Sequence, residues 1–230
     1  MCDGVQHVTN SRLYCGDAPN PGRAAPSPHL VEFYDAYTTA QAGIVSIVME
    51  YMSGGSLQEL LSHGPLTDEE QLSSIARQVM KGLAFLHKGH QIHRDIKPAN
   101  ILRSFDGTVK LADFGIAREL DDSMAKANTF IGTLIYMAPE RIESEGYSYA
   151  ADVWAVGLSI LALALGKFPY STNGGYWALS RAIKEEPPPQ VPDSFSKDFK
   201  EFILLVRRRN RAAVSSMRLA LVGWLMAWLL

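Results

Sequence analysis

One octapeptide, residues 93–100, restricts the possible folds of this chain more than any other stretch. Within one short polar segment it holds a carboxylate at Asp95, an ammonium at Lys97 and a carboxamide at Asn100. Phosphoryl transfer needs groups of these kinds, because a hydroxyl must be oriented, phosphate charge neutralised and magnesium held by oxygen ligands. The alternative is a polar turn that collected these residues by chance.

Two tripeptides further along the chain favour the first explanation. Asp113-Phe114-Gly115 and Ala138-Pro139-Glu140 follow the octapeptide in the order typical of enzymes that transfer phosphate from ATP to proteins. Either tripeptide alone is weak, since an Asp-Phe-Gly is usually only a turn. Three such segments in this order are a strong pattern.

The hydrophobic periodicity predicts strands followed by a mainly helical region. Segments 30–37 and 44–51 are rich in β-branched and aromatic residues, which is typical of paired strands. Thr67 and Glu70 form a capping-box pattern before a helix that we expect to end near His87. We also expect a short helix ending at Leu61, strands at 101–103 and 109–111, an irregular segment at 115–138, and helices at 148–165, 175–184 and 195–206.

Composition excludes several classes of protein. The net charge is −2, but the only charged side chains after residue 203 are five arginines, so the body is acidic and the tail basic. We therefore expect no nucleic-acid partner, which would require a basic stripe on a folded face. Cys2 and Cys15 both lie in the irregular N-terminal segment, which argues against a disulfide framework or metal site and favours a cytoplasmic location.

Residues 28 to about 203 resemble the serine/threonine type of the protein kinase family, and within it the mitogen-activated protein kinase kinases. The closer resemblance rests on segments 123–133 and 136–142, where the spacing of Ser123 and Thr129 is similar to that of plant and protist members. It implies an α+β kinase fold, mainly the helical C-lobe with a two-strand remnant of the N-lobe sheet. The expected domains are an irregular leader at 1–27, a truncated kinase domain at 28–206, and a basic then hydrophobic tail at 207–230. Within the kinase domain, 28–52 is expected to be the N-lobe remnant and the hinge to the C-lobe, and 53–206 the C-lobe.

The resemblance implies roles for the residues of the catalytic segments. Asp95 is expected to accept the proton of the substrate hydroxyl, Lys97 to contact the transferred phosphate, and Thr133 to brace both. Asn100 and Asp113 are expected to ligate magnesium. The resemblance also implies that Asp152 holds the backbone of the catalytic loop, although spacing alone fits a helix-capping carboxylate equally well.

The resemblance also implies an ATP site and a regulatory site. The residues expected to bind the nucleotide are Met49, Glu50, Met52, Leu102, Lys97, Asn100 and Asp113. A phosphate on Ser123 or Thr129 is expected to pair with Arg94 and to order the loop, unless both are ordinary loop hydroxyls. The implied cofactors are ATP and Mg²⁺, and the implied partners are a mitogen-activated protein kinase as substrate and an upstream activating kinase.

The sequence departs from the family at its beginning. No glycine-rich loop precedes residue 53, and the first lysine is Lys81, whereas the family pairs a strand lysine with a helix glutamate. Because that pair must be in place for transfer, we expect greatly reduced turnover by this polypeptide. The chain is then a truncated kinase, from a gene model or splice product, and the alternative function is a catalytically impaired binding module or decoy.

The tail, residues 207–230, admits several interpretations. Residues 219–230 are apolar but too few to cross a bilayer, and extending the segment back to residue 212 includes Arg218. Arginines before an apolar end could anchor a helix at a membrane surface. We favour a terminal helix packed on the C-lobe, or out-of-frame sequence, over membrane contact through 212–230.

Overall fold

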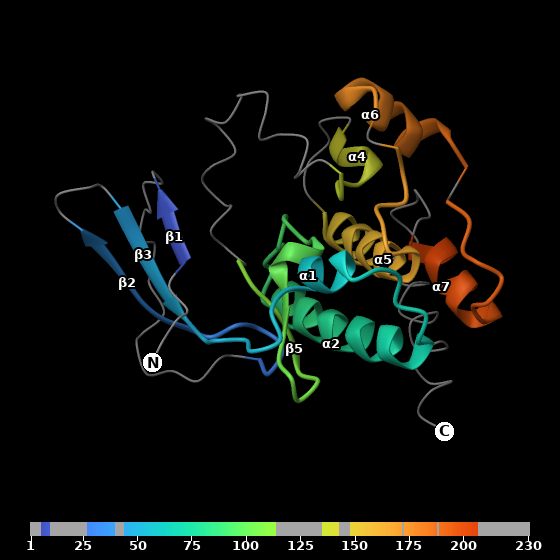
Figure 1. Cartoon of the computed structure of the whole chain (residues 1–230). Helices are drawn as coiled ribbons and strands as arrows, with labels where there is room; N and C mark the ends of the chain where they lie inside the picture. Colours follow the sequence, from blue (N-terminus) through green and yellow to red (C-terminus); the bar gives the residue numbers. More distant parts are fainter. Residues whose placement is uncertain are drawn as a thin grey trace.

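The chain begins with a small antiparallel sheet in which β3 (Ile44–Met49) lies between β1 (Gln6–Thr9) and β2 (Phe33–Thr39). The computed structural model describes residues 6–9, 27–39, 44–113, 135–142, 148–171, 173–187 and 189–206. β2 and β3 confirm the predicted strand pair. β1 lies in the segment expected to be irregular, so this sheet has three strands rather than two, and it stands apart from the helices (Figure 1).

The residues just before β2 leave the hairpin and join the helical region. Leu30 pairs in parallel with Leu111 of β5 (Val109–Leu111), and the Val31 N–H donates to the Leu111 carbonyl at 2.9 Å. Leu30 is fully buried there. The prediction of one strand over 30–37 is therefore wrong at its start, because burial of Leu30 in the main core competes with pairing to β3.

The rest of the described chain is mainly helical. Its main core is built around α5, which is buried on nearly all sides, with one face of α2 packed beside it at the centre (Figure 1). This arrangement has the α+β character that the sequence predicts. The helices are α1 (Leu57–Ser62), α2 (Glu69–Lys88), α4 (Pro139–Ile142), α5 (Tyr149–Leu165), α6 (Gly175–Glu185) and α7 (Lys197–Val206).

Helix α2 starts one residue later than its sequence pattern suggests. The N-cap is Asp68, whose Oδ1 accepts hydrogen bonds from the N–H groups of Glu70 and Gln71, so the Thr67 capping box is wrong. An aspartate satisfies the free N–H groups of a first turn at least as well as a threonine. A capping box does occur at α1, between Ser56 and Glu59.

Helix α5 is apolar nearly all round and crosses the centre of the core, as predicted. It begins at the N-cap Ser148 and ends at Gly166, which has φ 67°. A Cβ on Gly166 would lie 2.4 Å from the Pro65 nitrogen, so only glycine fits this position. Among the described residues no helix is both long and apolar enough to cross a membrane, and the segment 212–230 lies outside those residues.

A two-stranded hairpin packs on α2 and directly follows the octapeptide in the chain. A 3₁₀ turn, η1 (Pro98–Asn100), leads into β4 (Ile101–Arg103), which pairs with β5. Gln78 of α2 fixes the hairpin, since its amide donates to the Gly107 carbonyl at 3.0 Å and its oxygen accepts from the Val109 N–H at 2.9 Å. The hairpin therefore has a fixed place on the helical core.

Candidate active site

The loop that carries the octapeptide is anchored by one buried carboxylate from α5. Asp152 is 2% exposed, and it accepts hydrogen bonds of 2.9 Å from the backbone N–H groups of both His93 and Arg94. The ring of His87, at the end of α2, donates a third bond of 2.9 Å from Nε2. Asp152 thus joins two helices to the loop and does more than cap a helix.

His93 occupies the centre of this arrangement. Its ring is 1% exposed, Nε2 donates to the Ala112 carbonyl at 3.0 Å, and Nδ1 accepts from the Asp95 N–H at 3.4 Å. The neutral tautomer with its proton on Nε2 satisfies both bonds. Burial lowers the pKa of His93 from its usual value, with the charge of Asp152 acting in the opposite direction.

This lowered pKa predicts acid sensitivity. The folded state binds the His93 proton less tightly than the unfolded state, so stability should fall as the pH drops below about 6.5. Urea midpoints at pH 7.0 and 5.5 measure the effect. His93→Phe should show a smaller difference between the two midpoints than the parent, whereas His90→Asn, at an exposed position, should not. An equal difference in parent and His93→Phe would contradict this account.

Asp95, Lys97 and Asn100 form one hydrogen-bonded group. Lys97 Nζ lies 2.7 Å from Asp95 Oδ2, and Asn100 Nδ2 donates to both the carbonyl oxygen and Oδ2 of Asp95 at 2.9 Å. The carboxylate and the ammonium are each about one quarter exposed, so both are accessible to a ligand. The structure therefore brings together all three polar groups of the octapeptide.

Asp113 is held beside this group by the end of β5. The Ala112 N–H donates to the Asn100 carbonyl at 2.9 Å, which ties the strand to the loop, and Asp113 has φ 60°. Burial raises the pKa of the Asp113 carboxyl, the nearby Asp95 charge raises it further, and His93 and Lys97 act in the opposite direction. Asp113 therefore follows a strand whose end is hydrogen-bonded to the loop that carries Asn100.

The donor set at Asn100 and Asp113 fits a magnesium ion. The side-chain nitrogen of Asn100, Nδ2, donates to Asp95, which leaves the side-chain oxygen Oδ1 to act as a metal ligand. One carboxylate and one carboxamide are oxygen ligands of the kind that Mg²⁺ takes together with water and phosphate oxygens. Among the described residues no group of three or more His, Cys, Asp or Glu side chains could hold a metal.

An apolar cluster lies between the three-stranded sheet and β4. Met52 is buried with Val31 and Ala112, and Met49 and Leu102 pack against them while partly exposed. Three of the residues predicted to contact the adenine, Met49, Met52 and Leu102, are thus brought together. Sequence reasoning missed Val31 and Ala112, although Ala112 directly precedes Asp113.

Glu50, the fourth predicted adenine contact, follows β3 and is held by its side chain. Its carboxylate oxygens lie 2.6 and 2.8 Å from Lys110 Nζ, and Oε2 accepts from the Glu32 N–H at 3.1 Å. The Glu50 N–H donates to the Glu32 carbonyl at 2.8 Å. Sequence reasoning missed Lys110, because nothing in its strand distinguishes it from a solvent-facing lysine.

A small cavity opens beside Asp95. It is lined by Arg94 and Asp95 from the loop, by segment 136–138 and Arg141, and by α5. Burial raises the pKa of Tyr136 in its wall to about 12. The predicted residues Thr133, Ser123 and Thr129 lie outside the described residues, so the structure does not test them.

Comparison with known proteins matches the sequence of this chain to one family. The family described as "Protein kinase domain" matches residues 23–220, a range wider at both ends than the predicted 28–206. Mitogen-activated protein kinase kinase 3 of Arabidopsis thaliana is 44% identical over 176 residues, which are 76% of this chain and 34% of that relative. The dual specificity mitogen-activated protein kinase kinase 1 of Dictyostelium discoideum is 46% identical over 147 residues, 64% of this chain and 22% of that relative.

A third relative is covered over more of its own length. Mitogen-activated protein kinase kinase 9 of Arabidopsis thaliana is 39% identical over 230 residues, which are 90% of this chain and 73% of that relative. Three further relatives, from Physcomitrium patens and Arabidopsis thaliana, are matched over about half of their length. The three relatives named here are mitogen-activated protein kinase kinases, and the chain belongs to the protein kinase family.

Proposed function

We propose that this chain carries the catalytic machinery of a dual-specificity kinase that transfers the γ-phosphate of ATP to hydroxyl groups of a mitogen-activated protein kinase. The observation that supports it most directly is the contact of Asp95 with both Lys97 and Asn100. A carboxylate, a cation and an oxygen donor in one accessible group are what phosphoryl transfer uses. The substrate class is inferred from relatives at about 40% identity.

In this proposal each polar residue has one task. Asp95 orients the substrate hydroxyl and accepts its proton, and Lys97, already 2.7 Å from Asp95, takes up negative charge on the transferred phosphate. Asn100 and Asp113 would hold a magnesium ion, which when bound would neutralise charge on the phosphate oxygens. Thr133, outside the described residues, would brace Asp95 and Lys97.

The apolar cluster is proposed to hold the adenine ring. Leu102 forms its floor and Met49 its back wall, while Glu50 and Met52 offer backbone groups to the ring edge. Phosphorylation of Ser123 or Thr129 by an upstream kinase would let Arg94 pair with the phosphate. The Arg94 backbone, with φ 73°, is already fixed by Asp152, so phosphate binding would act on the loop through a rigid point.

Replacing Asp95 with asparagine tests the proposal. The asparagine keeps the size of the side chain but cannot accept a proton, so transfer should fall by about 10²- to 10⁴-fold. The measurement is MgATP-dependent labelling of a mitogen-activated protein kinase that has been inactivated by mutation. Asp193→Asn, at an exposed site far along the chain, is the matched control and should transfer at the parent rate. Equal transfer by Asp95→Asn and the parent would refute a catalytic role for Asp95.

A second candidate function is a non-catalytic module that binds partner kinases. It is supported by the first eighty residues, which contain no lysine to pair with the nucleotide phosphates. Phosphotransfer by the chain and by its Asp113→Ala variant separates the two functions. Equal signals, together with retained binding of the partner kinase, would favour the module over the enzyme.

A further inference from the structure

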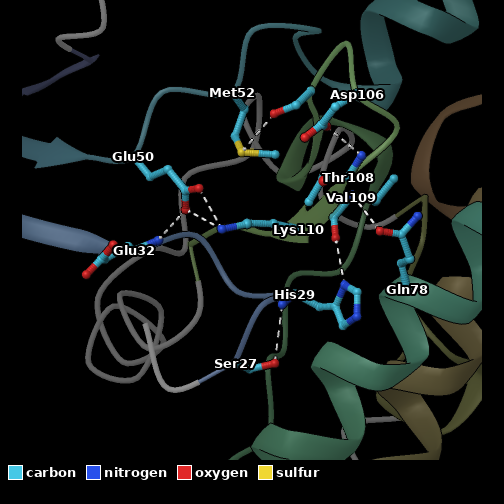
Figure 2. A network of polar contacts seen from close by, with 11 residues as sticks. Ser27, His29, Glu32, Glu50, Met52, Gln78, Asp106, Thr108, Val109 and Lys110 are labelled. Atoms are coloured by element: carbon cyan, nitrogen blue, oxygen red, sulfur yellow. Dashed lines mark hydrogen bonds and ion pairs between the residues drawn. The ribbon is translucent and has the colours of Figure 1, made fainter. Parts of the chain in front are cut away.

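The ion pair between Glu50 and Lys110, here called the hinge ion pair, joins the two sides of the candidate nucleotide site. Lys110 lies in the middle of β5, between the buried residues Val109 and Leu111. Successive side chains in a strand point to opposite faces, so Lys110 points away from the helical core. Figure 2 shows its ammonium meeting the Glu50 carboxylate at the end of β3.

The hinge ion pair is more than an exposed surface contact. The side chains of Lys110 and Glu50 are 14% and 23% exposed, and both carboxylate oxygens lie within 2.8 Å of the ammonium. The same carboxylate accepts the Glu32 N–H, so it is fixed from two directions. Partly buried, hydrogen-bonded pairs are screened less by solvent than exposed ones. By contrast, Arg181 and Glu185 form an exposed pair on α6.

The strand that carries Lys110 also fixes the metal side of the site. Leu111 is bonded on one edge to the segment before β2, through the His29 carbonyl and the Val31 N–H. The Ala112 N–H donates to the Asn100 carbonyl, and Asp113 follows. One short strand thus contacts the loop through Ala112 at its end and Glu50 through the Lys110 side chain.

We infer that Lys110 is a positioning residue for nucleotide binding: the hinge ion pair holds the adenine-contacting backbone at Glu50 in a fixed place relative to Asp113. This inference rests on the proposed function, because it assumes that the apolar cluster receives adenine and that Asp113 receives the metal. A nucleotide must reach both ends at once, so a fixed spacing lowers the ordering cost of binding.

The test is the affinity of the full chain for Mg·ADP, measured by calorimetry. Lys110→Met removes the charge but keeps the length of the stem, and it should weaken binding about tenfold, equivalent to about 1.4 kcal/mol. Lys110→Arg keeps the pair and should bind within about twofold of the parent. Lys200→Met breaks the exposed pair with Asp193 and should leave the affinity unchanged.

Hydrogen exchange of the unliganded protein gives a readout that does not depend on nucleotide binding. Lys110→Met should speed exchange of the amides at 50–53 and leave those of 154–164 in α5 unchanged. If the parent does not bind ADP, the proposed function fails, and exchange at 50–53 still decides the positioning role. Unchanged exchange there, or equal or tighter ADP binding by Lys110→Met, overturns the inference. If Lys110→Met does not fold, Lys110→Gln takes its place with the same expected results.

Discussion

Asp152→Ala is expected to lower the free energy of unfolding by about 3 to 5 kcal/mol and to abolish phosphotransfer. The carboxylate is buried and accepts bonds from the His93 and Arg94 backbone and from the His87 ring. Alanine would leave these three donors unsatisfied inside the protein. The loop that carries Asp95 would then lose its fixed conformation, so stability and transfer should fall together. Urea unfolding and the transfer assay measure the two effects.

Asp198→Ala is the matched control for this prediction. Asp198 also lies in the first turn of a helix, α7, but its side chain is exposed. Its loss removes only a favourable interaction with the helix dipole, worth less than about 1 kcal/mol. A cost at Asp152 no greater than that at Asp198 would show that the carboxylate merely favours the start of its helix.

Gly82→Val is expected to cost about 3 kcal/mol, although glycine inside a helix is normally unfavourable. A Cβ at this position of α2 would lie 2.6 Å from the His29 carbonyl oxygen. That oxygen cannot move freely, because it accepts the Leu111 N–H at 2.9 Å and the neighbouring Leu30 is fully buried. The valine must therefore push the segment around His29 away from α2, or strain both the segment and the helix.

Ala84→Val places the same side chain on the exposed face of the same helix. It should cost only the difference in helix propensity, about 0.5 kcal/mol. Thermal or urea unfolding of the two variants gives the comparison. Similar costs at residues 82 and 84 would mean that the contact with His29 tolerates a larger separation than the structure indicates.

Local patterns predicted most of the helical part correctly. The apolar period of α2 and the all-round apolar surface of α5 each identified a helix, because every turn of those segments repeats the same burial requirement. The N-cap of α2 was misassigned by one residue, since Thr67 and Asp68 can both accept from a first turn. The order of Asp95, Asn100 and Asp113 identified residues that the fold brings together.

Contacts between distant segments could not be predicted in this way. The departure of Leu30 from the strand, and the meeting of Lys110 with Glu50, depend on where β5 lies relative to the chain sixty to eighty residues earlier. No local periodicity encodes such a distance. Strand β1 was missed for the same reason, because its four residues gain regular structure only by pairing with β3.

The pairing of Leu30 and Val31 with Leu111 also determines where the chain can be shortened safely. A recombinant fragment that starts at Phe33 would preserve the β2–β3 hairpin yet uncover one edge of β5, together with the apolar surface that Leu30 now covers. Bare strand edges beside apolar surface favour pairing between molecules. Fragments intended for biochemical work should therefore begin ahead of Ser27, because residues 29–31 pair with β5 and not with the β2–β3 hairpin that follows them.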